Sequence, residues 1–354
     1  MKKKCLRTVE FIGIGLVLIM AMLLGQIATK SEAAEVKVYK WKMQSHLTPG
    51  DPRYELGHAK KLPQLVKERT DGRIEITVYP PGAICKVPDQ LDALGNGVID
   101  MMSGFGGYWQ GKVPVAEVES GPSLAWGNAH DVVSCFWDRG LEDLVREAYK
   151  PFKVYYLTPL PGPSNAVLGG ILSNVPLPDI KSCKGVKIRA PGAWSRWFKE
   201  LGFSVTFLPM GEIYTALSLK TINGAYTSWA SLYGMKVHEV TKYMVDVSQN
   251  YADHLMVSAK AWNELPKDLQ QTMTATAREF ALWFSRNQEA EAVKAKQFLL
   301  KAGIKEFVWS PQDMKLAMEK AQLTWEEIAA KDKNCAKGIG IVKQYRAWVA
   351  AGCP

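Results

Sequence analysis

One long helical segment limits what this chain can fold into more than any other feature. It begins after Pro266, a residue suited to the first turn of a helix, and continues to Gly303, a residue common at helix ends. An apolar stripe follows part of this length and consists of Leu269, Met273, Phe280 and Phe284. A helix of about 35 residues is about 50 Å long. Because that exceeds the width of one small domain, we expect the helix to cross two domains, either straight or with a kink.

Upstream of this helix, segments typical of strands and of helices alternate along the chain. Strand patterns cover residues 36–45, 73–82, 98–106, 152–162, 166–174, 183–192, 204–209 and 222–229. Helical patterns cover residues 58–72, 88–97, 193–202 and 210–220, and a further helix is predicted from Ser310 to about Asp332. This alternation favours an α/β fold with mainly parallel sheets, and the length favours about two domains.

The first 33 residues have the layout of a secretory signal peptide. A basic start precedes an almost wholly apolar run from Phe11 to Gly25, and Ser31 and Ala33 fit the small-x-small rule for a cut after Ala33. The apolar run is shorter than the roughly 20 residues that span a bilayer comfortably, which disfavours the alternative of an uncleaved anchor. We therefore expect a soluble protein exported to the periplasm.

Charge and cysteine content exclude several classes of function. Without residues 1–33 the formal charge falls from +9 to +6, and the charges are scattered, so we predict no nucleic-acid partner. No C-x-x-C pair is present, which leaves a zinc or thioredoxin-like site without support. Cys335 and Cys353 flank a short C-terminal segment, and we expect a disulfide between them worth about 3 kcal/mol. The cysteines beyond the signal peptide are odd in number, so at least one stays unpaired.

Catalytic and metal-binding motifs are also missing. The segment GGYWQGKVP (106–114) has the glycine spacing of a phosphate loop, but Val113 replaces the hydroxyl that would hold magnesium. Neither H-E-x-x-H nor G-x-S-x-G occurs, and we predict no catalytic residue and no metal site. Tyr108 and Trp109 lie in this loop after a buried strand. They can wall a ligand cleft, or pack against their own loop.

Arg189 is the main candidate for a ligand contact. In CKGVKIRAPG (183–192) apolar and basic residues alternate until Pro191 and Gly192 end the strand. Ligands of open α/β sheets bind beyond the carboxyl ends of strands, where a guanidinium can hold a carboxylate through two parallel hydrogen bonds. Lys187 lies farther from the strand end and is expected to be solvated. Trp194 and Trp197 follow the turn and could wall the cleft or belong to the core, with the core favoured for Trp197.

Several segments match the motifs of one known family in order along the chain. They are KERTDGRIEITVYPPG (67–82), LGNGVIDMM (94–102), CKGVKIRAPG, EIYTALSLKTINGA (212–225) and AWNELPKDLQQTM (261–273). The chain resembles the solute-binding proteins of tripartite ATP-independent periplasmic (TRAP) transporters over nearly its whole mature length. GYWQGKVP and VLGG resemble most the branch associated with 2-oxo acids and related carboxylates.

The resemblance implies a two-lobed α/β periplasmic binding protein fold with a hinge and a long helix that spans both lobes. Lobe I would comprise residues 34–157 with about 251–285, and lobe II residues 158–250 with about 286–354, including the C-terminal helices. The lobes would close around one organic acid and deliver it to TRAP membrane permease subunits, and a homodimer is possible. The acidic residues that hold a cation beside the ligand in the 2-oxo acid branch are not evident, because Tyr226 and Thr227 stand at that place. We therefore predict no cofactor, and an aromatic or more apolar carboxylate.

The predicted ligand-binding residues all follow strand ends or lie in the motifs above. They are Gln44, Tyr108, Trp109, Asn165, Arg189, Trp194, Met210, Tyr226 and Trp229. Arg189 would pair with the carboxylate and Asn165 and Gln44 would donate to its remaining oxygens, while the aromatic residues would wall the cleft. The alternatives are a binding protein for a neutral or polyol ligand, an exported enzyme, and a sensor subunit that reports ligand occupancy.

Overall fold

The computed structural model describes residues 37–352 except 164–168 and 248–249. The predicted signal peptide and Cys353, the predicted disulfide partner of Cys335, lie outside these residues. All the helices and strands described below belong to the unit that starts at Tyr39. Within the described ranges, no helix combines the length and the apolar character needed to cross a membrane.

The first sheet has five strands in the order β2-β1-β3-β10-β4. Their bounds are Tyr39–Ser45 for β1, Ile74–Tyr79 for β2, Met101–Gly104 for β3, Val154–Pro161 for β4 and Ala252–Ser258 for β10. Strand β1 is parallel to β2 and β3, whereas β10 is antiparallel to both β3 and β4.

The second sheet has six strands in the order β11-β9-β5-β8-β6-β7. Their bounds are Gly169–Ser173 for β5, Lys187–Arg189 for β6, Ser204–Thr206 for β7, Gly224–Ser228 for β8, Tyr243–Asp246 for β9 and Lys305–Phe307 for β11. Strand β5 is antiparallel to β8 and β9, and the other pairs are parallel. Both sheets are therefore mixed, but β10 in the first sheet and β5 in the second are the strands that run against their neighbours, and the prediction of mainly parallel sheets is confirmed for the other strands. The chain passes between the sheets after β4, after β9 and after β10, and it enters β5 and β10 antiparallel to their neighbours and β11 parallel to β9.

Helices cover these sheets. The α-helices before the long helix are α2 (Leu62–Arg69), α3 (Gln90–Gly95), α4 (Ala116–Glu119), α5 (Ala129–Val133), α6 (Leu141–Tyr149), α7 (Gly192–Glu200), α8 (Ile213–Ser218), α9 (Trp229–Gly234) and α10 (Ala259–Asn263). Two π-helical segments cover Arg53–Lys61 and Ser134–Asp138, so the helix predicted from residue 58 begins five residues earlier. Short 3₁₀ turns cover Val87–Asp89, Gly106–Tyr108, Lys150–Phe152, Lys181–Cys183, Met210–Glu212 and Val237–Glu239.

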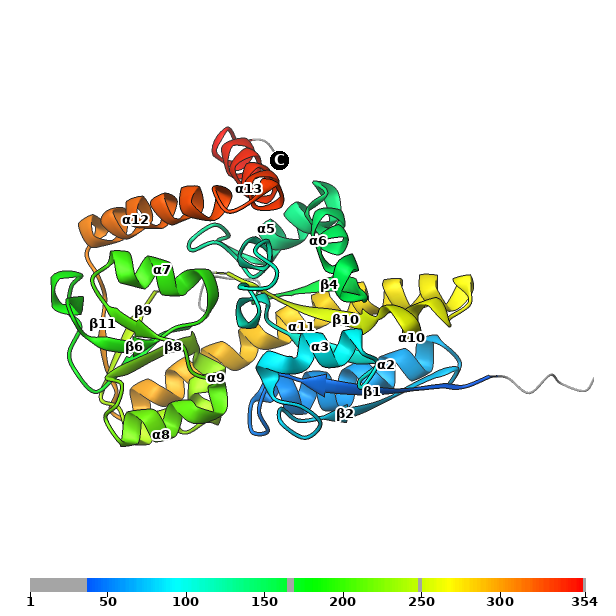
Figure 1. The fold of residues 1–354 in the computed structure, drawn as a ribbon. Coiled ribbons are helices and arrows are strands. Elements are labelled where there is room, and N and C mark those ends of the chain that lie inside the picture. The colour runs from blue at the N-terminus through cyan, green and yellow to red at the C-terminus, as the bar shows by residue number, and fades with distance from the viewer. Residues whose placement is uncertain (1–36, 164–168, 248–249, 353–354) are drawn as a thin grey trace, which may run out of the picture. The chain divides into compact units, whose positions relative to one another are not determined.

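The predicted long helix is α11, which runs from Lys267 to Lys301 without interruption. Figure 1 shows it in yellow and orange along both sheets. It packs on β4 and α2 of the first lobe, which contains the first sheet, and on α9 of the second lobe, which contains the second sheet. The predicted apolar stripe is almost wholly buried, and Phe280 and Phe284 lie in its middle. Burying a side chain of this size stabilises the fold by about 1.5–3 kcal/mol, so α11 holds the two lobes on one rigid element.

The C-terminal helices differ from the prediction. The helix predicted from Ser310 to about Asp332 is α12 (Pro311–Ala329), and Asp332 then caps a separate helix, α13 (Lys333–Ala350). Helix α13 packs against α6 and α4 of the first lobe, and the Tyr345 hydroxyl donates to Asp131 Oδ1 at 2.8 Å. The buried face of α13 packs in the same core as α6 and β4 of the first lobe, whereas the resemblance implies that residues 286–354 belong to the second lobe. In Figure 1, α12 leads from beside α7 to α13 near α5 and α6.

Candidate ligand-binding site

A cavity of about 480 Å³, counted with its opening to solvent, lies where the two sheets present their strand ends to each other. It is lined by His46, Arg53, Phe105, Tyr108, Gly169, Arg189, Pro191, Trp194, Met210, Tyr226, Thr227, Ser228, Tyr251 and Asp253. Most of these residues follow the carboxyl ends of the parallel strands β1, β3, β6 and β8 or lie at the start of β5 and β10, which run the opposite way. This is the edge at which α/β sheets bind ligands, and the volume suits a small molecule.

Arg189 ends β6 and extends its guanidinium into the cavity lining while only 1% of its surface is exposed. Its Nε donates to the Leu208 carbonyl at 2.9 Å and its Nη1 to the Tyr226 carbonyl at 3.1 Å, which fixes the plane of the group. No carboxylate of the described residues forms an ion pair with it. Burial lowers the pKa of Arg189 below its usual range, and Tyr108 offsets part of this effect. Arg189 is thus a buried cation that the described part of the chain does not neutralise.

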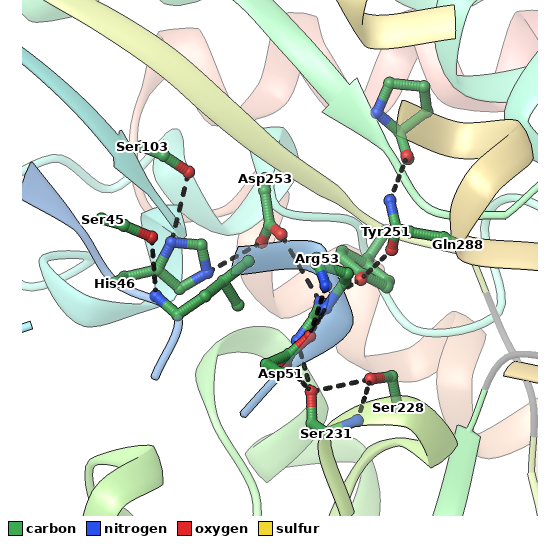
Figure 2. A network of polar contacts seen from close by, with 12 residues as sticks. Ser45, His46, Asp51, Arg53, Ser103, Ser228, Ser231, Tyr251, Asp253 and Gln288 are labelled. Carbon is green, nitrogen blue, oxygen red and sulfur yellow. Dashed lines mark hydrogen bonds and ion pairs between the residues drawn. The ribbon is translucent and has the colours of Figure 1, made fainter. Parts of the chain in front are cut away.

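The second arginine of the cavity, Arg53, is neutralised. Its Nε donates to Asp51 Oδ1 at 3.1 Å and its Nη2 to Asp51 Oδ2 at 2.7 Å, while its Nη1 donates to the Tyr251 hydroxyl at 2.7 Å. Tyr251 in turn donates to Gln288 Oε1 of α11 at 2.9 Å. Figure 2 shows Arg53 between Asp51 and Asp253 at the centre of this network.

The same network joins the two lobes. Asp51 and Arg53 follow β1 of the first lobe, whereas Ser231 belongs to α9 of the second. The Ser231 hydroxyl donates to Asp51 Oδ2 at 2.7 Å and accepts a hydrogen bond from Arg53 Nη2. Burial alone would raise the pKa of Asp51, but the charge of Arg53 and the hydrogen bonds from Arg53 and Ser231 outweigh it and lower that pKa. Asp51 therefore stays ionised in a buried site.

Asp253 and His46 form the wall of the cavity next to Arg53. The Nε2 of His46 lies 3.5 Å from Asp253 Oδ1, and its Nδ1 lies 3.4 Å from the Ser103 hydroxyl (Figure 2). The second oxygen of Asp253, Oδ2, lies 3.8 Å from Arg53 Nη1, too far for a hydrogen bond. Within the described ranges this oxygen has no hydrogen-bond partner.

Aromatic rings from both lobes form a continuous belt around the cavity. Ring centroids lie 5.0 Å apart for Tyr226 and Trp194, 5.4 Å for Trp194 and Phe105, 6.0 Å for Phe105 and Tyr108, and 6.1 Å for Tyr108 and His46. The Trp194 indole Nε1 is buried and has no partner among the described residues. Flat rings with a single unpaired donor suit a ligand with an apolar or planar body and an acceptor group.

The structure brings together five of the nine predicted site residues. Arg189, Tyr108, Trp194, Met210 and Tyr226 all line the cavity. Trp197, for which the core was favoured, is fully buried and donates from Nε1 to the Ala317 carbonyl at 2.8 Å. Lys187 is exposed, as expected for a solvated side chain.

Three other predicted residues do not line the cavity, and Asn165 lies outside the described residues. The Gln44 amide accepts from the backbone N–H groups of Ile84 and Cys85 and donates to the Cys85 carbonyl. Its hydrogen-bonding groups therefore hold the loop after β2 and do not face the ligand. Trp109 donates from Nε1 to the Tyr149 hydroxyl at 2.7 Å inside the first lobe. Trp229 is fully buried, and its ring packs so closely on Gly170 that a Cβ there would lie 2.5 Å from it.

The sequence prediction missed Arg53, Tyr251 and Asp253. Asp253 and Tyr251 were not identified because the strand at 252–258 was not predicted, so neither residue could be placed at the start of a strand. His46 was within reach of the strand-end argument, since β1 ends at Ser45 and His46 is the first residue beyond it. Across the described ranges, no group of three or more His, Cys, Asp and Glu side chains is placed to hold a metal ion.

Comparisons with known proteins agree with this architecture. A model for the family described as bacterial extracellular solute-binding protein, family 7, matches residues 45–332. A monocarboxylate 2-oxoacid-binding periplasmic protein of Nostoc sp. is 27% identical over 281 residues, which cover 77% of this chain and 75% of that protein.

Solved structures of TRAP solute-binding proteins are similar over most of their length. One from Pseudoalteromonas atlantica, with bound sodium and pyruvate, has a TM-score of 0.77 at 25% identity and covers 89% of this chain and 96% of its own. Another from Bordetella bronchiseptica, a dimer with calcium and picolinate, has a TM-score of 0.79 at 20% identity, covering 89% of this chain and 94% of its own. The predicted two-lobed periplasmic binding protein fold is confirmed.

Proposed function

This chain belongs to family 7 of the bacterial extracellular solute-binding proteins, the receptors of TRAP transporters, and from that premise we propose that it captures a small organic acid in the periplasm. The captured acid is then passed to membrane permease subunits. Members of the family are receptors and not enzymes, which confirms both the predicted family and the predicted lack of catalysis. A homodimer stays a prediction for this chain.

Arg189 carries the proposal that the ligand is a carboxylate. It is the buried cation of the cavity without an acidic partner in the described part of the chain, and burying an uncompensated charge is costly. A ligand carboxylate would remove that cost and accept charge-assisted hydrogen bonds from the guanidinium. The unpaired Trp194 Nε1 in the same cavity supplies a further donor for a carboxylate oxygen. The names of the relatives, which bind 2-oxo acids, pyruvate and picolinate, point to the same class.

The experiment compares charged and uncharged ligands on protein that has been unfolded and refolded to remove any bound molecule. Isothermal titration with pyruvate, propionate, benzoate and phenylalanine is matched by titration with the corresponding primary amides and with polyols. We expect acids to bind and their amides to bind at least about 100-fold more weakly, since two charge-assisted hydrogen bonds contribute about 3 kcal/mol together.

The matched variants are Arg189→Met and Lys187→Met. Lys187 lies on the same strand, two residues earlier, and is exposed, so its loss tests the general effect of removing one positive charge there. Arg189→Met should abolish acid binding and Lys187→Met should leave it unchanged. Equal binding of acids and amides would show that the site does not recognise the carboxylate charge. Acid binding that survives in Arg189→Met would show that another group holds the carboxylate and that Arg189 is structural.

A further inference from the structure

Among the described residues, Asp253 is the one carboxylate that lines the cavity, and the proposed carboxylate ligand does not satisfy it. Its side chain is 2% exposed, and its Oδ2 has no hydrogen-bond partner within the described ranges. Arg53, the nearest cation, is turned towards Asp51 and reaches Asp253 only at 3.8 Å. A buried carboxylate oxygen without a donor is costly, so Asp253 Oδ2 requires a hydrogen-bond donor from the ligand side of the cavity.

The charges around the cavity point to the kind of donor. Arg53 and Arg189 carry two positive charges, and Asp51 and Asp253 carry two negative charges, so these buried groups balance in number, although neither of these carboxylates forms an ion pair with Arg189. A simple monoanion on Arg189 would leave the closed cavity with one excess negative charge. A ligand that brings a positive charge of its own keeps the cavity neutral, which a low-dielectric site favours.

The aromatic belt fits the same kind of ligand. A protonated nitrogen that donates to Asp253 would lie among the rings of Tyr108 and Tyr251, which line the cavity beside it. Ring faces attract a cation, and they do so more strongly when the cation is desolvated. The apolar remainder of the ligand would pack on Phe105 and Trp194.

We propose that the ligand is a zwitterion, an amino carboxylate with a flat or apolar body whose carboxylate pairs with Arg189 and whose protonated nitrogen donates to Asp253. The inference rests on the proposed function, since it takes the carboxylate contact at Arg189 as given. It departs from the 2-oxo acids named for the relatives, because a ketone oxygen is an acceptor and cannot satisfy Asp253.

The test uses sets of probes that differ only in the nitrogen. L-phenylalanine is compared with 3-phenylpropionate and phenylpyruvate, and 4-(aminomethyl)benzoate with 4-methylbenzoate, so that two spacings between the charges are sampled. Titrations on refolded protein are run in sodium-free buffer with EDTA, and then with added sodium or calcium. In at least one set we expect the zwitterion to bind at least about tenfold more tightly than its partners, without added cation.

Asp253→Asn supplies the second arm, with Asp246→Asn as the matched control. Asp246 is a partly buried aspartate of β9 that pairs with Lys296 and does not line the cavity. Asp253→Asn should remove the preference for the zwitterion, and Asp246→Asn should preserve it. The variants are compared only after circular dichroism shows that they are folded, and the wild-type comparison of probes needs no variant.

The inference is overturned if the acids without nitrogen bind as tightly as the zwitterions in both sets. Proton uptake on binding of a simple acid, or dependence of that binding on sodium or calcium, would show that a proton or a metal ion restores neutrality in place of a ligand nitrogen, which also counts against the inference. Retention of the preference in Asp253→Asn also refutes it. If simple acids bind as tightly as the zwitterions and Arg189→Met abolishes this binding, the proposed function is retained and only the proposal of a zwitterionic ligand is rejected. If no acid or zwitterion binds at all, the proposed function fails first.

Discussion

The hydroxyl of Ser231 is the smallest group whose removal should weaken the contact between the lobes. It donates to Asp51 Oδ2 and accepts from Arg53, and all three side chains are buried. Asp51 and Arg53 belong to the first lobe and Ser231 to the second, so the two hydrogen bonds form only when the lobes meet. Ser231→Ala removes both bonds, together with the hydrogen bond between the Ser231 and Ser228 hydroxyls within the second lobe, without altering either charge.

The expected loss can be worked out from these contacts. A hydrogen bond to a charged group contributes about 1.5–3 kcal/mol, but Asp51 and Arg53 keep their bidentate pairing with each other after the substitution. We therefore expect a loss of about 2 kcal/mol, nearer to one such bond than to two. If ligand binding requires lobe closure, this weakens affinity by about 30-fold, and most of the change falls on the dissociation rate.

Stopped-flow and titration measurements on Ser231→Ala with the tightest-binding acid test this value. Thr241→Ala is the matched control, because its buried hydroxyl donates to the Val237 carbonyl at 2.9 Å entirely within the second lobe. Thr241→Ala should lower the free energy of unfolding by about 1 kcal/mol and leave the dissociation constant unchanged. An unchanged dissociation constant in Ser231→Ala, or a loss equal to that of the control, would refute the role of this contact in closure.

Three further perturbations follow from other parts of the structure. Burial lowers the pKa of His58 well below its usual range, so its contribution to the free energy of unfolding is fully present above the unfolded-state pKa of about 6.5. This contribution is lost as the pH falls towards the folded-state pKa, by about 1.4 kcal/mol per pH unit. Urea unfolding of wild type and His58→Gln between pH 7 and pH 5 should therefore give a shallower pH dependence for the variant, and equal slopes would contradict this. Gly107→Ala would place a Cβ in steric overlap with the Phe105 ring and 2.8 Å from the Gly192 Cα of the other lobe. It should weaken acid binding by displacing Phe105 from the cavity lining and by holding the lobes apart, which small-angle scattering would detect as a more open shape. Gly111→Ala, with no atom within 4 Å of its Cβ, should bind normally. Gln44→Leu should lower the free energy of unfolding by about 1–3 kcal/mol in urea titrations and leave the affinity for acids unchanged, because the Gln44 amide is hydrogen-bonded to the backbone at 84–85. A loss of affinity without a loss of stability would show that Gln44 contacts the ligand.

Local patterns in the sequence were enough to predict α11, several other helices and strands, and one side of the site. Periodicity predicted α11, since an apolar stripe at helical spacing can be buried only along one helix face. Alternation and the turn at Pro191 and Gly192 placed Arg189 at a strand end, and the strand-end rule then placed it at the ligand edge of a sheet. These inferences need only neighbours along the chain, because backbone propensity and side-chain periodicity act over a few residues.

Contacts between residues far apart in the chain follow from the packing of the whole fold. Arg53 and Tyr251 are 198 positions apart and Asp51 and Ser231 are 180 apart, and no local pattern links them. Gln44 and His46 illustrate the same point at short range, because the exact end of β1 and the path of the loop at 84–85 decide which of them faces the cavity. Strand pairing and register set these contacts, and they depend on the free energy of the whole packed chain, whereas helix and strand periodicity is written into each segment separately.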